Sequence, residues 1–63
     1  MKEKLIELRK LTGLNQIQFA EKVGCSSKHI SQMELGKSQV SFKTLKKYAL
    51  IFGYDIDVIF RSL

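Results

Sequence analysis

Four glycines and a lack of proline determine how this 63-residue sequence can fold. The glycines divide it into segments of 12, 10, 11, 16 and 10 residues, each long enough for one helix. Glycine often follows the last residue of a helix, because it adopts the left-handed backbone conformation at little steric cost. In the first four segments apolar residues recur every three or four positions. We therefore expect an all-α fold in a single domain that spans residues 1–63.

Polar residues suited to capping precede the second, third and fourth segments. Asn15 begins a capping-box pattern, and Ser26 and Ser41 stand where the next two helices would begin. The third segment carries only two large apolar residues on its inner side, Ile30 and Met33. We expect this helix to bury a narrow stripe and to expose most of its surface.

The C-terminal segment, residues 54–62, fits two structures. Apolar residues alternate from Tyr54 to Phe60 as in a strand, but they also match one face of a fifth helix. Five of the seven residues from Tyr54 to Phe60 are β-branched or aromatic, which favours the strand. An unpaired apolar strand would pair with its copy in a second chain, and so short a chain gains stability by self-association. We therefore expect a homodimer, with residues 54–63 at its interface.

Composition narrows the functional classes. Cys25 and His29 are the only residues of their types, too few for a structural zinc site or a catalytic triad. We expect no metal, no cofactor and no enzymatic activity. No apolar run approaches the ~18 residues that span a bilayer. We therefore expect no membrane partner. A lone cysteine is typical of proteins in a reducing compartment, so we also expect a cytoplasmic protein.

Positive charge is concentrated in the middle of the chain. Residues 9–47 hold eight basic and two acidic side chains, a charge of +6. Residues 1–8 are neutral, and residues 48–63 carry a charge of −1. Positive charge gathered in one region is typical of proteins that bind nucleic acids.

Residues 16–35 comprise a short helix, a three-residue turn and a second helix. Ala20 is small where the two helices must cross, and Gly24 lies in the turn. Four stretches match a known family: Gly13-Leu14-Asn15-Gln16, Ala20-Glu21-Lys22-Val23-Gly24, Ile30-Ser31-Gln32-Met33-Glu34 and Gly36-Lys37. From residue 3 to about 53 the chain thus resembles the helix-turn-helix domain of lambdoid phage repressors and Cro proteins (XRE type). The resemblance implies a compact four-helix lambda-repressor-like domain.

The outer face of the third predicted helix suits the major groove of double-stranded DNA. Lys28 and Gln32 lie on this face, flanked by Ser31 and Leu35, and Ser27 lies in the first turn. An amide can bind adenine, and a lysine can donate to guanine. The resemblance implies that Ser27, Lys28 and Gln32 contact bases. The alternative is a solvated helix face.

The resemblance also implies contacts to the phosphate backbone. Gln16 matches the phosphate-clamping glutamine of the family, and Arg9 with Glu34 matches a pair that links the first helix to the end of the third. The loop after the third helix and the first turn of the fourth would hold the backbone from the other side. The expected phosphate contacts are Arg9, Gln16, His29, Ser31, Lys37, Ser38, Gln39 and Lys43.

Together these observations predict a sequence-specific DNA-binding transcriptional regulator. We expect a repressor that binds a two-fold operator as a dimer. The alternative is an antitoxin that neutralises a partner toxin protein and regulates its own operon. The resembled family includes such proteins, and some of them end in a strand.

Overall fold

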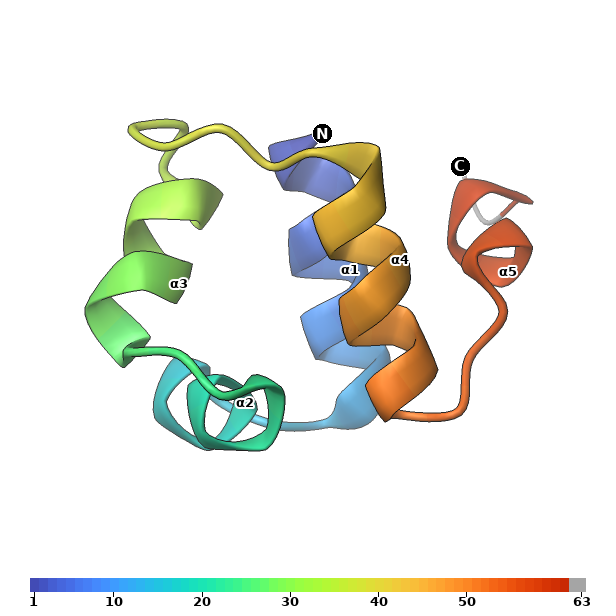
Figure 1. Cartoon of the computed structure of the whole chain (residues 1–63), viewed down its shortest axis with the longest axis horizontal. Coiled ribbons are helices and arrows are strands. Elements are labelled where there is room, and N and C mark those ends of the chain that lie inside the picture. Colours follow the sequence, from blue (N-terminus) through green and yellow to red (C-terminus); the bar gives the residue numbers. More distant parts are fainter. Residues whose placement is uncertain (62–63) are drawn as a thin grey trace.

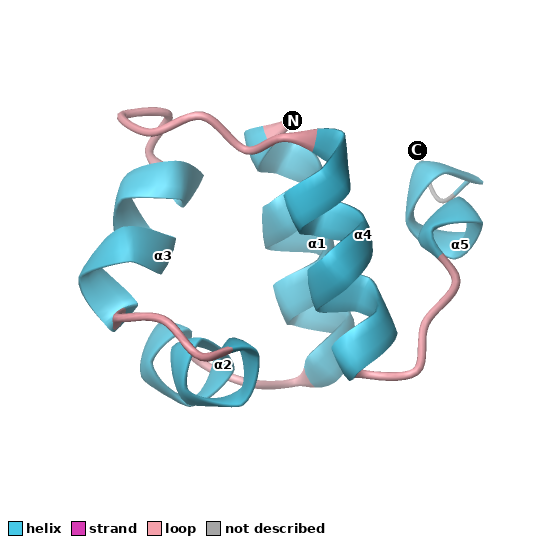
Figure 2. Cartoon of the chain, in the orientation of Figure 1, coloured by secondary structure: helices cyan, strands magenta, loops and turns pink. Residues whose placement is uncertain are grey.

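The computed structural model describes residues 1–61, and within this range the chain forms five α-helices. The helices are α1 (Lys2–Thr12), α2 (Gln16–Val23), α3 (Ser27–Glu34), α4 (Phe42–Ile51) and α5 (Ile56–Arg61). Helix α1 packs against α4 in the centre, with α2 and α3 on one side and α5 on the other (Figure 1). Helices and loops account for all of the described residues (Figure 2), so the all-α prediction is confirmed.

The predicted capping residues begin three of the helices. The Asn15 side chain accepts from the Gln18 backbone N–H at 2.8 Å, and the Gln18 side chain accepts from the Asn15 N–H at 3.1 Å. The hydroxyl oxygens of Ser26 and Ser41 accept from backbone N–H groups at the starts of α3 and α4. These bonds satisfy donors that would otherwise lack a partner, so each helix begins at a defined residue.

Apolar side chains from all five helices meet in one core. The Phe19 ring of α2 stacks on Phe52 at a centroid distance of 5.2 Å and meets Tyr48 edge to face at 6.0 Å. Ile30 and Met33 are the buried residues of α3, as the sequence predicted. The buried residues are Leu5, Leu8, Phe19, Ala20, Val23, Ile30, Met33, Val40, Leu45, Tyr48, Ala49, Ile56 and Ile59.

The preferred prediction for the C-terminal segment, a strand, is wrong, and the alternative of a fifth helix is correct. Ile56 and Ile59 are buried three positions apart, whereas Val58 is 48% exposed. An alternating strand would instead place Ile56 and Val58 on the same face. Residues 62–63 of this segment lie outside the described residues.

Contacts with α1 and α4 explain why residues Ile56–Arg61 form a helix. The Lys4 Nζ lies 4.8 Å from the centroid of the Phe60 ring and donates to the Ile59 carbonyl oxygen at 3.5 Å. The Phe60 ring also packs against Phe42 of α4 at a centroid distance of 5.7 Å. These tertiary contacts outweigh the β-propensity of the segment, because that propensity is weak and depends on context.

We predict that the free energy of unfolding depends strongly on the small buried side of α3. Ile30 is fully buried, so Ile30→Val should lower this free energy by about 0.5–1.5 kcal/mol. Ile17 of α2 is 61% exposed, and Ile17→Val is the matched control, with an expected change below about 0.5 kcal/mol. Urea unfolding followed by circular dichroism measures both. Equal losses in the two variants would contradict the prediction.

Candidate nucleic-acid interface

The turn between α2 and α3 has the length predicted from the sequence, Gly24 to Ser26. Gly24 adopts a left-handed conformation with φ of 83°, which favours glycine. The backbone N–H groups of Gly24 and Cys25 donate to the Ala20 carbonyl oxygen at 2.9 and 3.0 Å. Ala20 is 2% exposed. The turn therefore fixes the angle between α2 and α3, and the predicted helix-turn-helix over residues 16–35 is present.

Cys25 connects this turn to α4. The thiol is half-buried against the core, and the Tyr48 hydroxyl donates to its sulfur at 3.9 Å. The pKa of Tyr48 is raised to about 12. Burial is the largest cause, and the hydrogen bond to Cys25 is the second. The phenol therefore stays protonated near neutral pH and remains available as the donor.

Helix α3 presents a mostly polar surface on the side away from the core. Lys28 is exposed and Gln32 is half-buried. Leu35, the residue that ends the helix, is 62% exposed. These side chains lie four and then three positions apart, on the opposite side of the helix from Ile30 and Met33.

The other predicted contact residues of α3 differ in accessibility. His29 is exposed at the side of this face. Ser31 is half-buried, and so is Ser27 in the first turn of the helix. A half-buried serine has a short reach, so either serine can contact only a group that comes close to the helix.

Arg9 and Glu34 form the predicted link between α1 and the end of α3. Arg9 Nε donates to Glu34 Oε2 at 2.7 Å, and Arg9 Nη2 donates to Oε1 at 3.1 Å. Arg9 Nη1 donates to the Leu14 carbonyl oxygen at 3.2 Å. The side chains are 20% and 8% exposed, respectively. Two parallel charge-assisted hydrogen bonds make this a strong and directional contact.

The structure adds a third member to this link that the sequence did not reveal. Gln16 Nε2 donates to Glu34 Oε1 at 3.1 Å, so one carboxylate orients two predicted phosphate-contacting residues. Arg9, Gln16 and Ile17 help to line a shallow hollow at the start of α2. The first turn of α2 contains no acidic residue, and the N-terminal end of a helix favours anions.

The loop after α3 carries the next group of predicted phosphate contacts. The backbone N–H groups of Lys37 and Ser38 donate to the Gln32 carbonyl oxygen at 2.8 and 3.3 Å, which ties the loop to the end of α3. Lys37 and Gln39 are exposed, and Ser38 is half-buried. Lys43 is exposed in the first turn of α4.

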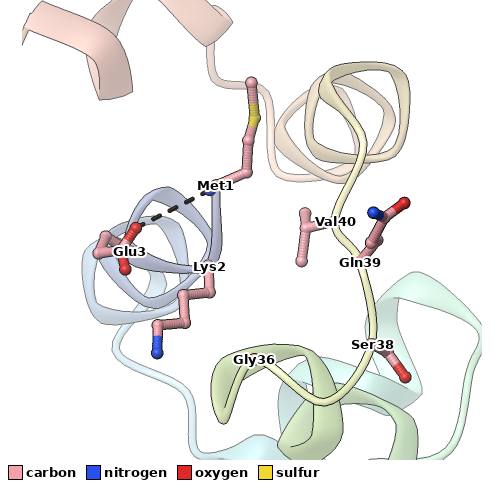
Figure 3. A pocket seen from close by; sticks show the side chains of 7 residues that line it. All are labelled: Met1, Lys2, Glu3, Gly36, Ser38, Gln39 and Val40. Atoms are coloured by element: carbon pink, nitrogen blue, oxygen red, sulfur yellow. Dashed lines mark ion pairs between the residues drawn. The ribbon is translucent and has the colours of Figure 1, made fainter.

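A basic residue near this loop was missed in the sequence. Lys2 extends from the start of α1 toward Gly36, across an open pocket that Ser38 and Gln39 also line (Figure 3). The pocket has a volume of about 620 Å³. Only the tertiary fold brings Lys2 to this place, because 34 positions separate it from Gly36.

Candidate metal sites and membrane-spanning helices are absent from the described part of the chain. Residues 1–61 contain no group of three or more histidine, cysteine or acidic side chains that could hold a metal ion. Within the same residues, no helix combines the length and the apolar character needed to cross a membrane.

We predict that the Arg9–Glu34 pair stabilises the fold. In a double-mutant cycle, Arg9→Met and Glu34→Gln should show a coupling free energy of about 1–3 kcal/mol in urea unfolding. Glu21 is exposed on α2, and Glu21→Gln is the control. The effects of Glu21→Gln and Arg9→Met on the free energy of unfolding should be additive to within about 0.5 kcal/mol. A coupling no larger than the control value would refute a stabilising role.

Comparisons with known proteins agree with this geometry. A family model described as helix-turn-helix matches residues 5–59. Among curated proteins, an uncharacterized HTH-type transcriptional regulator of Methanocaldococcus jannaschii is 42% identical over 60 residues, which cover 95% of this chain and 91% of that protein. No solved structure matches the chain significantly. The resemblance to the phage repressor and Cro type is thus confirmed, and the chain belongs to the helix-turn-helix family of DNA-binding transcriptional regulators.

Proposed function

We propose that the protein is a cytoplasmic repressor that binds a two-fold operator in double-stranded DNA as a homodimer. The observation that carries the proposal is the division of α3 into two sides. Ile30 and Met33 anchor one side in the core, and the opposite side is left for a ligand. A helix of ~10–12 Å diameter fits the ~12 Å major groove.

Three residues of α3 are proposed to contact bases. The Gln32 amide can donate to and accept from one adenine, and the Lys28 ammonium can donate to guanine N7 and O6. Ser27 lies in the first turn, where its hydroxyl can contact either kind of base. Of these three residues, Gln32 should discriminate most strongly between bases, because a bidentate contact requires one donor and one acceptor at defined positions on the base edge.

The remaining predicted residues are proposed to hold the phosphate backbone on both sides of α3. Arg9 and Gln16, oriented by Glu34, would bind it beside the start of α2. The loop after α3 and the first turn of α4 would bind it on the other side. The proposed phosphate contacts are Arg9, Gln16, His29, Ser31, Lys37, Ser38, Gln39 and Lys43.

The proposed dimer would use the surface of α4 and α5. Apolar side chains stay exposed there: Leu50 at 63%, Val58 at 48%, Phe42 at 47% and Ile51 at 45%. Residues 54–63 remain the proposed dimerisation segment, in which helix α5 (Ile56–Arg61) replaces the expected strand. Two α3 helices about 34 Å apart would then enter successive major grooves.

The antitoxin role remains the alternative, and the same exposed apolar surface is the observation that favours it. A toxin protein could cover α4 and α5 and leave α3 accessible. The C-terminal strand that first suggested this alternative is absent from residues 1–61. Purification of the chain from its native source separates the two roles, because an antitoxin would carry a stoichiometric toxin partner.

We predict that Gln32→Ala relaxes the base preference at one position of each half-site. Selection of bound sites from random duplexes should give the wild-type protein two inverted half-sites, about one helical turn apart. The variant should lose about 1–3 kcal/mol of discrimination at the base pair that Gln32 contacts. Selection of the same sites by both proteins would remove Gln32 from the base-contacting set, and the absence of any preferred site would overturn the proposed function.

We predict a different effect for Lys43→Ala. Loss of a phosphate contact should weaken binding to all duplexes about equally and reduce the salt dependence of log K by about one unit. Fluorescence anisotropy at several salt concentrations measures both quantities. Lys46 is an exposed lysine of the same helix outside the proposed set, and Lys46→Ala is the control. An equal decrease in the salt dependence of log K in the two variants would show that Lys43 contributes only general charge.

A further inference from the structure

A large apolar side chain lies at the end of the proposed DNA-facing side of α3. Leu35 is 62% exposed at the end of α3. It follows Gln32 by three positions and Lys28 by seven, and these spacings place the three side chains on the same side of a helix. Leu35 therefore continues the row of side chains that we propose to face the major groove.

The backbone around Leu35 is held in a defined position. Its φ and ψ of −82° and −8° remain helical, and its N–H donates to the Ser31 carbonyl oxygen at 2.9 Å. The loop behind it is fixed by the hydrogen bonds from Lys37 and Ser38 to the Gln32 carbonyl oxygen. Because the backbone here is already fixed, covering Leu35 costs side-chain conformational entropy but little backbone entropy.

The surroundings of Leu35 favour a polyanion over an apolar protein surface. Lys28 and Lys37, both exposed, precede and follow it in the sequence, and the first of them shares its face of the helix. Helix α5 of the proposed dimer surface lies at the opposite end of the molecule from α3, with α4 in the centre (Figure 1). A partner bound to α5 would therefore leave Leu35 exposed.

The major groove of DNA offers one apolar group that matches this side chain, the C5-methyl group of thymine. Leu35 lies about 4.5 Å beyond Gln32 along the helix axis, close to one base-pair step of about 3.4 Å. We propose that Leu35 is a specificity-determining residue that packs against a thymine methyl group next to the base pair contacted by Gln32. This inference rests on the proposed function, and it names a feature of the operator.

A double-substitution experiment on protein and DNA tests the contact. Each thymine of the preferred duplex is replaced in turn by deoxyuridine, which removes only the methyl group. Affinities of the full chain are measured by fluorescence anisotropy at one salt concentration. For the wild-type protein, replacement of one particular thymine, in either half-site, should weaken binding by about four-fold, the factor expected for one buried methyl-sized group. For Leu35→Ala, the same replacement should have no effect.

Leu11→Ala is the matched control, because Leu11 is 43% exposed but lies on α1, outside the proposed DNA contacts and the proposed dimer surface. It should respond to each deoxyuridine as the wild-type protein does, and circular dichroism should show the same helix content for all three proteins. The inference is overturned if Leu35→Ala and the wild-type protein lose the same factor at every thymine, or if no thymine methyl group affects binding. These outcomes leave the proposed function intact, because the chain would still bind a preferred duplex. If no preferred duplex exists, both proposals are wrong.

Discussion

The attachment of α3 to the rest of the molecule is the constraint on which the structure depends. A helix that binds DNA must be rigid, yet it can give only one side to the core. Ile30 and Met33 fill that side, and Glu34 fixes the end of the helix through hydrogen bonds to Arg9 and Gln16. The turn at Gly24 fixes its start. Two buried side chains and two restrained ends therefore replace the broad apolar face of an ordinary surface helix.

The use of a carboxylate within a basic surface has a physical explanation. The Glu34 side chain is only 8% exposed and accepts two hydrogen bonds from the Arg9 guanidinium, whose positive charge offsets the negative charge of the carboxylate. It holds the donors of Arg9 and Gln16 in a fixed geometry before any ligand arrives. Donors that are oriented in advance lose less entropy on binding than free side chains do. Glu34 thus lowers the net positive charge near the start of α2, but it holds the side chains of Arg9 and Gln16 in fixed positions.

Features that depend on a few neighbouring residues were predictable from the sequence. The caps at Asn15, Ser26 and Ser41 are examples, because each involves residues within one turn of the chain. Features that depend on distant residues were predictable only where the family resemblance implied them, as it did for the Arg9–Glu34 link. Helix α5 replaces the expected strand because of its contacts with Lys4 and Phe42, far away in the sequence. The bond from Gln16 to Glu34 joins residues 18 positions apart on different helices, so no local pattern reveals it.

The position of α5 bears on how the protein can assemble. Helices α3 and α5 lie at opposite ends of the molecule (Figure 1), whose longest extent is 27 Å. A second chain or another protein bound to α5 would therefore lie away from a ligand of α3. A helix at this place does not present the row of unpaired backbone N–H and C=O groups through which an edge strand pairs with a second strand. The proposed association through α4 and α5 would then come from side-chain packing, for which the exposed Leu50 of α4 and Val58 of α5 offer apolar surface.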